Sequence, residues 1–258
     1  MESLRVTLLQ YDISWENVKA NLDCLFFKFA DLAGKTDLVV LPEMFSTGFT
    51  MNPEAFAETN DGRTISFLLD ASKAYNFAIT GSFVAKVDNT FFNRGFFITP
   101  QGETTFYDKR HLFRMGDEPK HYTGGSKRTI VNYLGWNICL LICYDLRFPV
   151  WARNRNNEYD LLIYVANWPA PRVKVWDVLL KARAIENMAY VCGVNRIGLD
   201  GMGLKYVGQS VVINPRGEEL VKFGGEEQLE TVSLSYSAME KLRASFAVWK
   251  DADEFDIK

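Results

Sequence analysis

A cysteine, two glutamates and a lysine are the residues of this chain whose types and positions could support covalent chemistry. Cys143 lies between the apolar run 138–142 and the polar segment 144–147, so its thiol is expected where the core meets solvent and a small molecule could reach it. A free thiol has a pKa of about 8.5 and needs a nearby base or cation to become a nucleophilic thiolate. The alternative is that Cys143 is a small core residue, like Cys139 in the same run.

Glu43 is the candidate base. It follows the apolar run 37–41 and precedes Met44 and Phe45, so its carboxylate is expected to be shielded from water, which favours proton uptake. Taken alone, the same position would also suit a residue that ends a turn.

Lys109 and Glu118 could complete the charges of such a site. An ammonium group about 4 Å from a reacting oxygen would contribute roughly 4 kcal/mol in a partly shielded environment. Lys109 stands beside Asp108 and Arg110, however, so it could also belong to a solvated charged cluster. Glu118 has the surroundings of an ordinary loop acid, and its spacing alone does not mark it.

Alternating strand-like and helix-like segments would position these residues. Glu43 and Cys143 both follow strand-like runs, and the ends of strands are where α/β sheets usually hold functional residues. Strands are expected at residues 4–10, 37–41, 77–86, 92–99 and 104–108, and helices at 16–33 and 64–75.

Three segments of the first half recur in the same order in the second half. The pairs are residues 7–12 with 137–145, 37–41 with 160–165, and 98–103 with 213–218. Chance could produce one such pair, whereas three in order indicate two copies of one α/β unit. Two similar sheets packed face to face, with helices outside, would bury both sets of apolar strands. The sequence therefore predicts an α/β fold, a four-layer α-β-β-α sandwich with an internal two-fold repeat.

Composition limits the classes of function. The chain has 258 residues, 48% of them apolar, and no linker-like segment, so a single domain over residues 1–258 is expected. The net charge of −3, with both signs interleaved, offers no basic stripe for nucleic acid or an anionic membrane. The longest apolar run, 138–144, is far shorter than the roughly 20 residues that span a bilayer, and segment 1–6 lacks an apolar leader.

The cysteines and histidines argue against a metal site. Cys24, Cys139, Cys143 and Cys192 form no CxxC pair, and two histidines provide little material for Cys/His ligation. Reduced thiols of this kind fit a cytoplasmic protein. A thiol-redox role is disfavoured, because Cys139 would lie too far along the strand to pair easily with Cys143.

The candidate residues lie in segments that together resemble the motifs of the carbon-nitrogen hydrolase (nitrilase) superfamily. Leu-Pro-Glu43-Met resembles its glutamate motif, Tyr-Asp-Lys109-Arg-His-Leu-Phe its lysine motif, and Leu-Ile-Cys143-Tyr-Asp-Leu-Arg-Phe-Pro its cysteine motif. A second glutamate of the family precedes a glycine pair between the lysine and cysteine motifs. Glu118 falls at that place, with Asp117 as the competing choice. The resemblance covers nearly the whole chain and implies the sandwich fold.

The resemblance also implies roles. Cys143 would attack an amide carbon, Glu43 would take the thiol proton and pass it to the departing nitrogen, and water would hydrolyse the resulting thioester. Lys109 and the backbone N–H of Tyr144 would stabilise the oxyanion, and Glu118 would orient the substrate or water. No metal or cofactor is expected. Spacing alone leaves open a Cys-His pair, but the resemblance assigns proton transfer to glutamate.

Within the superfamily, three segments are most similar to the bacterial omega-amidase type: His-Leu-Phe113, Cys-Tyr-Asp-Leu-Arg-Phe-Pro149 and Asn-Trp-Pro-Ala-Pro-Arg172. This similarity implies hydrolysis of the terminal amide of 2-oxo dicarboxylic acid monoamides such as 2-oxoglutaramate, with release of ammonia. The substrate would be a small amide with a carboxylate, which an arginine fork binds in two places.

Three arginines could bind that carboxylate. Arg172, in a turn after an expected strand end, is preferred over Arg114 and Arg147. Arg147 is expected to pair with an internal acid such as Asp145. Trp168 would form an apolar wall of the pocket or fill the core.

Other functions would use the same residues. A nitrilase would share the triad but commonly has a longer C-terminal extension, and an N-carbamoyl amidase would differ only in pocket shape. A non-catalytic binding module would be expected to lack one of Glu43, Lys109 and Cys143. Family members usually pair through helices beside the cysteine motif, so the resemblance implies a homodimer, although the apolar face of residues 150–155 is short.

Overall fold

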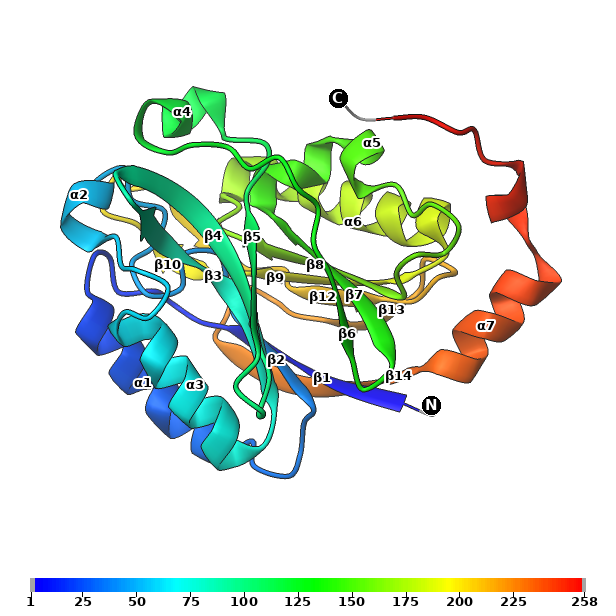
Figure 1. Cartoon of the computed structure of the whole chain (residues 1–258), viewed down its shortest axis with the longest axis horizontal. Coiled ribbons are helices and arrows are strands. Elements are labelled where there is room, and N and C mark those ends of the chain that lie inside the picture. Colours follow the sequence, from blue (N-terminus) through cyan, green and yellow to red (C-terminus); the bar gives the residue numbers. More distant parts are fainter. Residues whose placement is uncertain (1–2, 257–258) are drawn as a thin grey trace.

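The computed structural model describes residues 3–256, in which two six-stranded sheets carry helices on their outer faces (Figure 1). The predicted α/β class, with sheets flanked by helices, is confirmed. The first two and last two residues of the predicted domain, and with them part of segment 1–6, lie outside the described residues. Within the described range no helix combines the length and apolar character needed to span a membrane.

The first sheet has the order β14-β1-β2-β3-β4-β5. Its strands are β1 (Ser3–Gln10), β2 (Leu38–Val40), β3 (Ala78–Val87), β4 (Thr90–Ile98), β5 (Thr104–Asp108) and β14 (Gln228–Ser235). β1, β2 and β3 run parallel, and β4 and β5 follow as antiparallel hairpins. β14 returns from far along the chain and pairs antiparallel with β1, from Ser3 opposite Ser235 to Gln10 opposite Gln228.

The second sheet has the order β13-β12-β9-β8-β7-β6. Its strands are β6 (Ile130–Tyr133), β7 (Trp136–Ile142), β8 (Leu161–Ala166), β9 (Tyr190–Asn195), β12 (Val211–Ile213) and β13 (Glu219–Lys222). β7, β8 and β9 run parallel, and the strands outside them are antiparallel. The pairing scheme corresponds to that of the first sheet, with β7, β8, β9, β12 and β13 in the places of β1 to β5 and β6 in the place of β14.

Alternating side chains of β1 to β5 divide these strands between two cores. In β1, Leu4, Val6 and Leu8 belong to a core cluster that also contains β7, whereas Leu9 joins the core beneath the helices. This period of two is expected for a strand buried on both faces. The sheets approach closely at Gly95 of β4, where an added Cβ would lie 2.8 Å from Leu140 Cδ2.

Two long helices cover the first sheet and one covers the second (Figure 1). They are α1 (Val18–Ala30) and α3 (Arg63–Tyr75) on the first, and α6 (Val173–Asn187) on the second. The remaining helices are α2 (Pro53–Phe56), α4 (Glu118–His121), α5 (Pro149–Ala152) and α7 (Tyr236–Ser245), and a separate hairpin is formed by β10 (Ile197–Leu199) and β11 (Lys205–Val207).

The helix predicted over residues 16–33 is shorter than expected at its start. Asn17 caps it, because its side chain accepts a hydrogen bond from the backbone N–H of Ala20 over 3.1 Å. Glu16 has a left-handed φ of +50° and cannot continue the helix backwards. The helix also ends earlier than predicted, at Ala30 rather than at residue 33. The other predicted boundaries agree with the structure to within about two residues, which is the usual precision of helix and strand ends.

Candidate active site

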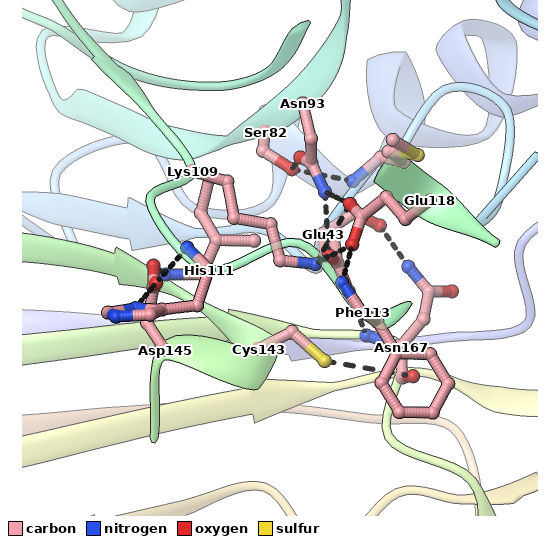
Figure 2. Close-up of polar contacts among 12 residues, drawn as sticks. Glu43, Ser82, Asn93, Lys109, His111, Phe113, Glu118, Cys143, Asp145 and Asn167 are labelled. Atoms are coloured by element: carbon pink, nitrogen blue, oxygen red, sulfur yellow. Dashed lines mark hydrogen bonds and ion pairs between the residues drawn. The ribbon is translucent and has the colours of Figure 1, made fainter. Parts of the chain in front are cut away.

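The structure brings the four predicted site residues together from separate elements (Figure 2). Glu43 follows β2, Lys109 follows β5, Glu118 begins α4, and Cys143 follows β7. Lys109 Nζ lies 2.9 Å from Glu43 Oε1 and 3.0 Å from each carboxylate oxygen of Glu118. All three of these charged side chains are buried. Lys109 is therefore part of a buried ion-pair network, and the alternative of a solvated basic cluster is wrong.

Glu118 is the first residue of α4, and the backbone of Phe113 holds it in place. One of its oxygens accepts a hydrogen bond from the backbone N–H of Phe113, and its own N–H donates to the Phe113 carbonyl over 3.3 Å. The expectation of an ordinary loop acid is wrong, because α4 turns the side chain inward toward Lys109. The competing residue Asp117 has an exposed side chain that pairs with Lys120 at the surface.

Cys143 occupies a strained backbone position. Its φ is +44°, in the left-handed region that residues other than glycine rarely adopt, and it begins a 3₁₀ turn (Cys143–Arg147) directly after β7. Such a conformation costs about 1–3 kcal/mol and persists where its surroundings enforce it. Here the Asp145 carboxylate accepts the N–H of Ile142 over 3.0 Å and so closes the turn. The half-buried thiol lies 3.9 Å from the carbonyl oxygen of Asn167.

Asp145 also holds His111 in place, and it does not pair with Arg147. It accepts hydrogen bonds from the Tyr107 hydroxyl over 2.7 Å and from the His111 backbone over 3.0 Å, and pairs with His111 Nδ1 at 2.8 Å. The predicted pairing of Arg147 with Asp145 is therefore wrong. The Arg147 guanidinium lies over the Trp168 ring, 5.4 Å from its centroid. His111 stacks on the ring at position 148 and belongs to the framework of the turn.

Burial and charge set the protonation states around Lys109. Burial alone would lower the pKa of Lys109, but the carboxylates of Glu118 and Glu43 outweigh it and hold that pKa above its ordinary value. Burial raises the pKa of Glu118, against the opposing charge of Lys109 and with the added repulsion of Glu43. Lys109 is thus an ammonium ion at neutral pH and supplies a fixed positive charge.

Cys143 is a neutral thiol in the resting site. Burial raises the pKa of Cys143 well above its ordinary value, and the Glu43 carboxylate raises it further, whereas Lys109 opposes both. A neutral thiol is a weak nucleophile, so a base must remove its proton as it attacks.

The two oxygens of Glu43 have different surroundings. Oε1 accepts hydrogen bonds from Lys109 Nζ and, over 2.7 Å, from Asn93 Nδ2. Oε2 accepts one from the backbone N–H of Asn167 over 2.8 Å, and the Asn167 side chain donates to the Glu43 carbonyl over 2.6 Å. Because Oε1 already has two charge-stabilising donors, Oε2 has the greater remaining capacity to take a proton.

A cavity of about 800 Å³ opens above Cys143 and Lys109. The predicted residues Tyr144, Trp168 and Arg172 all line it, as does Arg147, whereas Arg114 is not among its lining residues. The Arg172 guanidinium lies over the Phe113 ring at 5.0 Å. Neither the Arg147 nor the Arg172 guanidinium forms an ion pair with a carboxylate within residues 3–256. The cavity therefore combines a thiol with two cations available to an anionic ligand.

Asn93 and Ser82 contact the site, although the sequence did not single them out. Both are fully buried polar residues, Asn93 in β4 and Ser82 in β3, and both strands are largely apolar. A buried polar residue in an apolar strand must find a hydrogen-bond partner, and that rule is the signal that could have identified them.

Comparison with known proteins identifies one matching family and relatives that are named amidases. The family model described as carbon-nitrogen hydrolase matches residues 5–244. The omega-amidase YafV of Escherichia coli K12 is 45% identical over 258 residues, which cover 100% of both chains. The 2-oxoglutaramate amidase of Bacillus subtilis is 31% identical over 251 residues, covering 95% of this chain and 96% of that protein.

Solved structures share the same fold. The carbon-nitrogen hydrolase superfamily protein XC1258 of Xanthomonas campestris is 40% identical, with a TM-score of 0.98 over 100% of both chains. Nit3 of Saccharomyces cerevisiae has a TM-score of 0.84 at 22% identity, covering 95% of this chain and 94% of that one. The second likeness concerns the fold alone.

Proposed function

The chain belongs to the carbon-nitrogen hydrolase family and is an amidase, and from this premise we propose that it hydrolyses the terminal amide of 2-oxo dicarboxylic acid monoamides, such as 2-oxoglutaramate, with Cys143 as nucleophile. One observation carries this proposal: Lys109 lies 2.9 Å from Glu43 Oε1 and 3.0 Å from Glu118, beside the Cys143 thiol in one cavity. A base, a fixed cation and a nucleophile are the groups that acyl transfer from an amide requires.

The first half of the reaction forms a thioester. Cys143 Sγ attacks the amide carbon while its proton passes to Glu43 Oε2, and the carbonyl π electrons move to the oxygen. The Lys109 ammonium and the backbone N–H of Tyr144 stabilise this oxyanion. The tetrahedral intermediate then collapses: Glu43 gives the proton to the nitrogen, the carbon–nitrogen bond breaks, and ammonia leaves.

The second half restores the enzyme. Glu43, again a carboxylate, takes a proton from a water molecule that attacks the thioester carbon. When the carbon–sulfur bond breaks, this proton returns to the Cys143 sulfur and the carboxylic acid product leaves. Glu118 keeps Lys109 charged and in place through both halves, since its two oxygens accept hydrogen bonds from Lys109 Nζ.

Two arginines of the cavity that form no ion pair within residues 3–256 support a substrate with a carboxylate. Arg172, the residue preferred from the sequence, and Arg147 both line the cavity with their guanidinium groups over aromatic rings. A guanidinium binds a carboxylate by two parallel hydrogen bonds, and an aromatic ring beneath it favours one orientation of its plane. The omega-amidase and 2-oxoglutaramate amidase relatives support the same class of substrate.

We also propose a cytoplasmic homodimer that pairs through α5 and the neighbouring face of α6. Val150 of α5 and Val178 and Ile185 of α6 have exposed fractions of 55%, 66% and 51%. Apolar side chains exposed on adjacent helices are typical of a surface that a second copy covers. Sedimentation velocity should show a dimer that a Val150→Asp, Val178→Asp variant loses, and a monomeric wild type would overturn this arrangement.

Ammonia release from 2-oxoglutaramate tests the proposed activity. Glutamine, a simple nitrile and a carbamoyl amino acid are the competing substrates, and Cys143→Ala is compared with wild type and with Cys24→Ala. Cys24 is a half-buried thiol in α1 outside the cavity, so its variant should retain activity. We expect a preference for the 2-oxo acid amide and complete loss of activity in Cys143→Ala.

We expect Arg172→Met or Arg147→Met to raise the KM for 2-oxoglutaramate roughly tenfold or more, because a charge-assisted hydrogen bond to the substrate carboxylate is lost.

Turnover of the nitrile alone would instead identify a nitrilase, and preference for the carbamoyl compound would identify a carbamoyl amidase. Equal activity of Cys143→Ala and wild type would exclude Cys143 as the nucleophile.

A further inference from the structure

Asn93 connects the two carboxylates of the site through one amide group. It lies in β4 opposite Val84 of β3, and its side chain is fully buried. Asn93 Nδ2 donates to Glu43 Oε1 over 2.7 Å and to Glu118 Oε1 over 3.2 Å (Figure 2). The carboxamide therefore contacts the same two acids as Lys109, from the side of the first sheet.

The direction of this amide is fixed by a chain of hydrogen bonds. The backbone N–H of Met44 donates to Ser82 Oγ over 2.8 Å, so the Ser82 hydroxyl proton is free to point elsewhere. It points to Asn93 Oδ1, which lies 2.9 Å from Ser82 Oγ. Because Oδ1 is the acceptor of this bond, the NH₂ end of Asn93 must face the carboxylates. Every polar atom of the side chain is thus committed, and the amide acts on the carboxylates only as a donor.

A donor-only contact distinguishes the two protonation states of Glu43. An ionised carboxylate accepts the hydrogen bonds from Asn93 and Lys109 at Oε1, whereas a proton on that oxygen would face two groups that cannot accept it. The shorter contact, 2.7 Å against 3.2 Å, is the one to Glu43 rather than to Glu118. The arrangement favours Glu43 as the anion and leaves Oε2 as the oxygen that can be protonated.

On the basis of the amidase mechanism proposed above, we infer that Asn93 is a positioning residue that keeps Glu43 ionised and directs the thiol proton of Cys143 to Glu43 Oε2. The balance of charge supports this inference. Lys109 supplies one positive charge to two carboxylates in a fully buried cluster, so the ionised cluster has an excess negative charge. The two N–H dipoles of the Asn93 amide offset part of that excess without adding an ion.

Alkylation of Cys143 by iodoacetamide between pH 5 and 9 tests the inference without any substrate. The modified Cys143 peptide is quantified by mass spectrometry, which separates it from Cys24. In wild type, the decrease of the alkylation rate toward low pH defines an acidic limb. In Asn93→Ala we expect this acidic limb to move up by about one pH unit, since one hydrogen bond to the ionised form is lost. On this limb the rate at a given pH should fall by up to about tenfold, and most of it should return at the alkaline end of the range.

Asn93→Asp provides a second variant of almost unchanged shape. It removes both N–H donors and adds a third carboxylate, so its acidic limb should lie above that of Asn93→Ala. Amide hydrolysis by both variants should show the same order in the pH profile of kcat, with KM within about threefold of wild type because Asn93 is not among the residues that line the cavity. A loss of rate that is equal at all pH values in both variants would overturn the inference.

The Ser82→Ala variant tests whether the orientation of the Asn93 amide, rather than its packing, affects the pH profile. This change removes the hydrogen bond that aligns the amide but leaves Asn93 in place, so a smaller shift in the same direction is expected. Because Ser82 is inferred to act through Asn93, the double variant Ser82→Ala, Asn93→Ala should shift the limb no further than Asn93→Ala. Independent, additive shifts would contradict this route. Since alkylation needs no amide, failure of 2-oxoglutaramate as substrate would leave this test unaffected.

Discussion

Lys109 stabilises the folded site through hydrogen bonds to two buried carboxylates. Its Nζ donates three hydrogen bonds, one to Glu43 and two to Glu118, with all three side chains buried. Removal of one partner from a buried ion pair leaves an uncompensated charge, which costs about 3–5 kcal/mol. The proposed catalytic role of Lys109 and its role in stability therefore coincide at this position.

Lys109→Met, which keeps the length of the side chain, should lower the free energy of unfolding by about 3 kcal/mol at pH 7. Part of the loss should be recovered at pH 5, because a buried carboxylate without its cation takes a proton more readily. Urea denaturation at both pH values measures the effect. Lys120→Met removes an exposed lysine and should change stability by less than about 0.5 kcal/mol. An equal loss at pH 5 and pH 7 would contradict the argument.

Glu43, Lys109 and Cys143 were singled out by the resemblance of their segments to family motifs, since residue types alone left structural roles open, but their contacts depend on the fold. Glu118 is nine positions from Lys109, and only the inward turn of α4 joins them. Arg147 was expected to pair with Asp145 because it belongs to the cysteine motif itself, whereas its contact is with Trp168 of another segment. Contacts between segments leave no local pattern, so a single sequence does not reveal them.

The contact between β4 and β7 sets the spacing of the two sheets and, through it, the site. Glu43 and Lys109 follow strands of the first sheet, and Cys143 follows a strand of the second. Gly95 of β4 faces Leu140 of β7, and a Cβ at that position would meet Leu140 Cδ2 at 2.8 Å. A distance below normal van der Waals contact must be relieved by movement of one sheet or the leucine.

Gly95→Ala should lower the free energy of unfolding by about 1–3 kcal/mol and lower activity more than stability alone explains, since the thiol moves relative to Glu43. Gly224→Ala is the control, because an added Cβ there has no atom within 4 Å. Thermal unfolding and kcat are measured for both. Identical behaviour of the two variants would show that the contact between the sheets is not tight.

Elements with long regular patterns were the most predictable. The strand expected at 104–108 matches β5, and the helix expected at 64–75 begins one residue later than α3 does. Short elements escaped prediction for a physical reason. The four residues of α4 are fewer than two helical turns, so they show no periodicity of apolar residues, and the hairpin β10–β11 has three residues per strand.

At the scale of the whole molecule, buried acids make the fold sensitive to alkaline pH. Burial raises the pKa of Cys139 to about 12 from an ordinary 9.0, and burial holds the pKa values of Tyr11, Tyr107 and Tyr159 well above 10.0. Such groups bind their protons more tightly in the folded state. Their stabilising contribution is complete below the ordinary pKa and is lost as the pH rises toward the folded pKa. Lys109, a base with a raised pKa, loses its contribution only above 10.5.

The free energy of unfolding should therefore stay nearly constant from pH 7 to about 8.5 and then fall, by at least about 2 kcal/mol between pH 9 and 10.5. Each group contributes up to about 1.4 kcal/mol per pH unit in this range. Urea denaturation followed by fluorescence measures the curve. Constant stability up to pH 10.5 would show that these groups are accessible to water in the folded state.

The pairing of β1 with β14 can form only late in synthesis of the chain on the ribosome. The last residue of β1 is Gln10 and its partner is Gln228, so 228 − 10 = 218 residues separate them. At a synthesis rate of about 5–20 residues per second, a ribosome needs roughly 10–45 seconds to produce the partner strand. Throughout that time the nascent chain exposes one edge of β1, whose backbone groups can pair with other chains. The strand order therefore leaves this edge of β1 without its partner until the last part of the chain has been made.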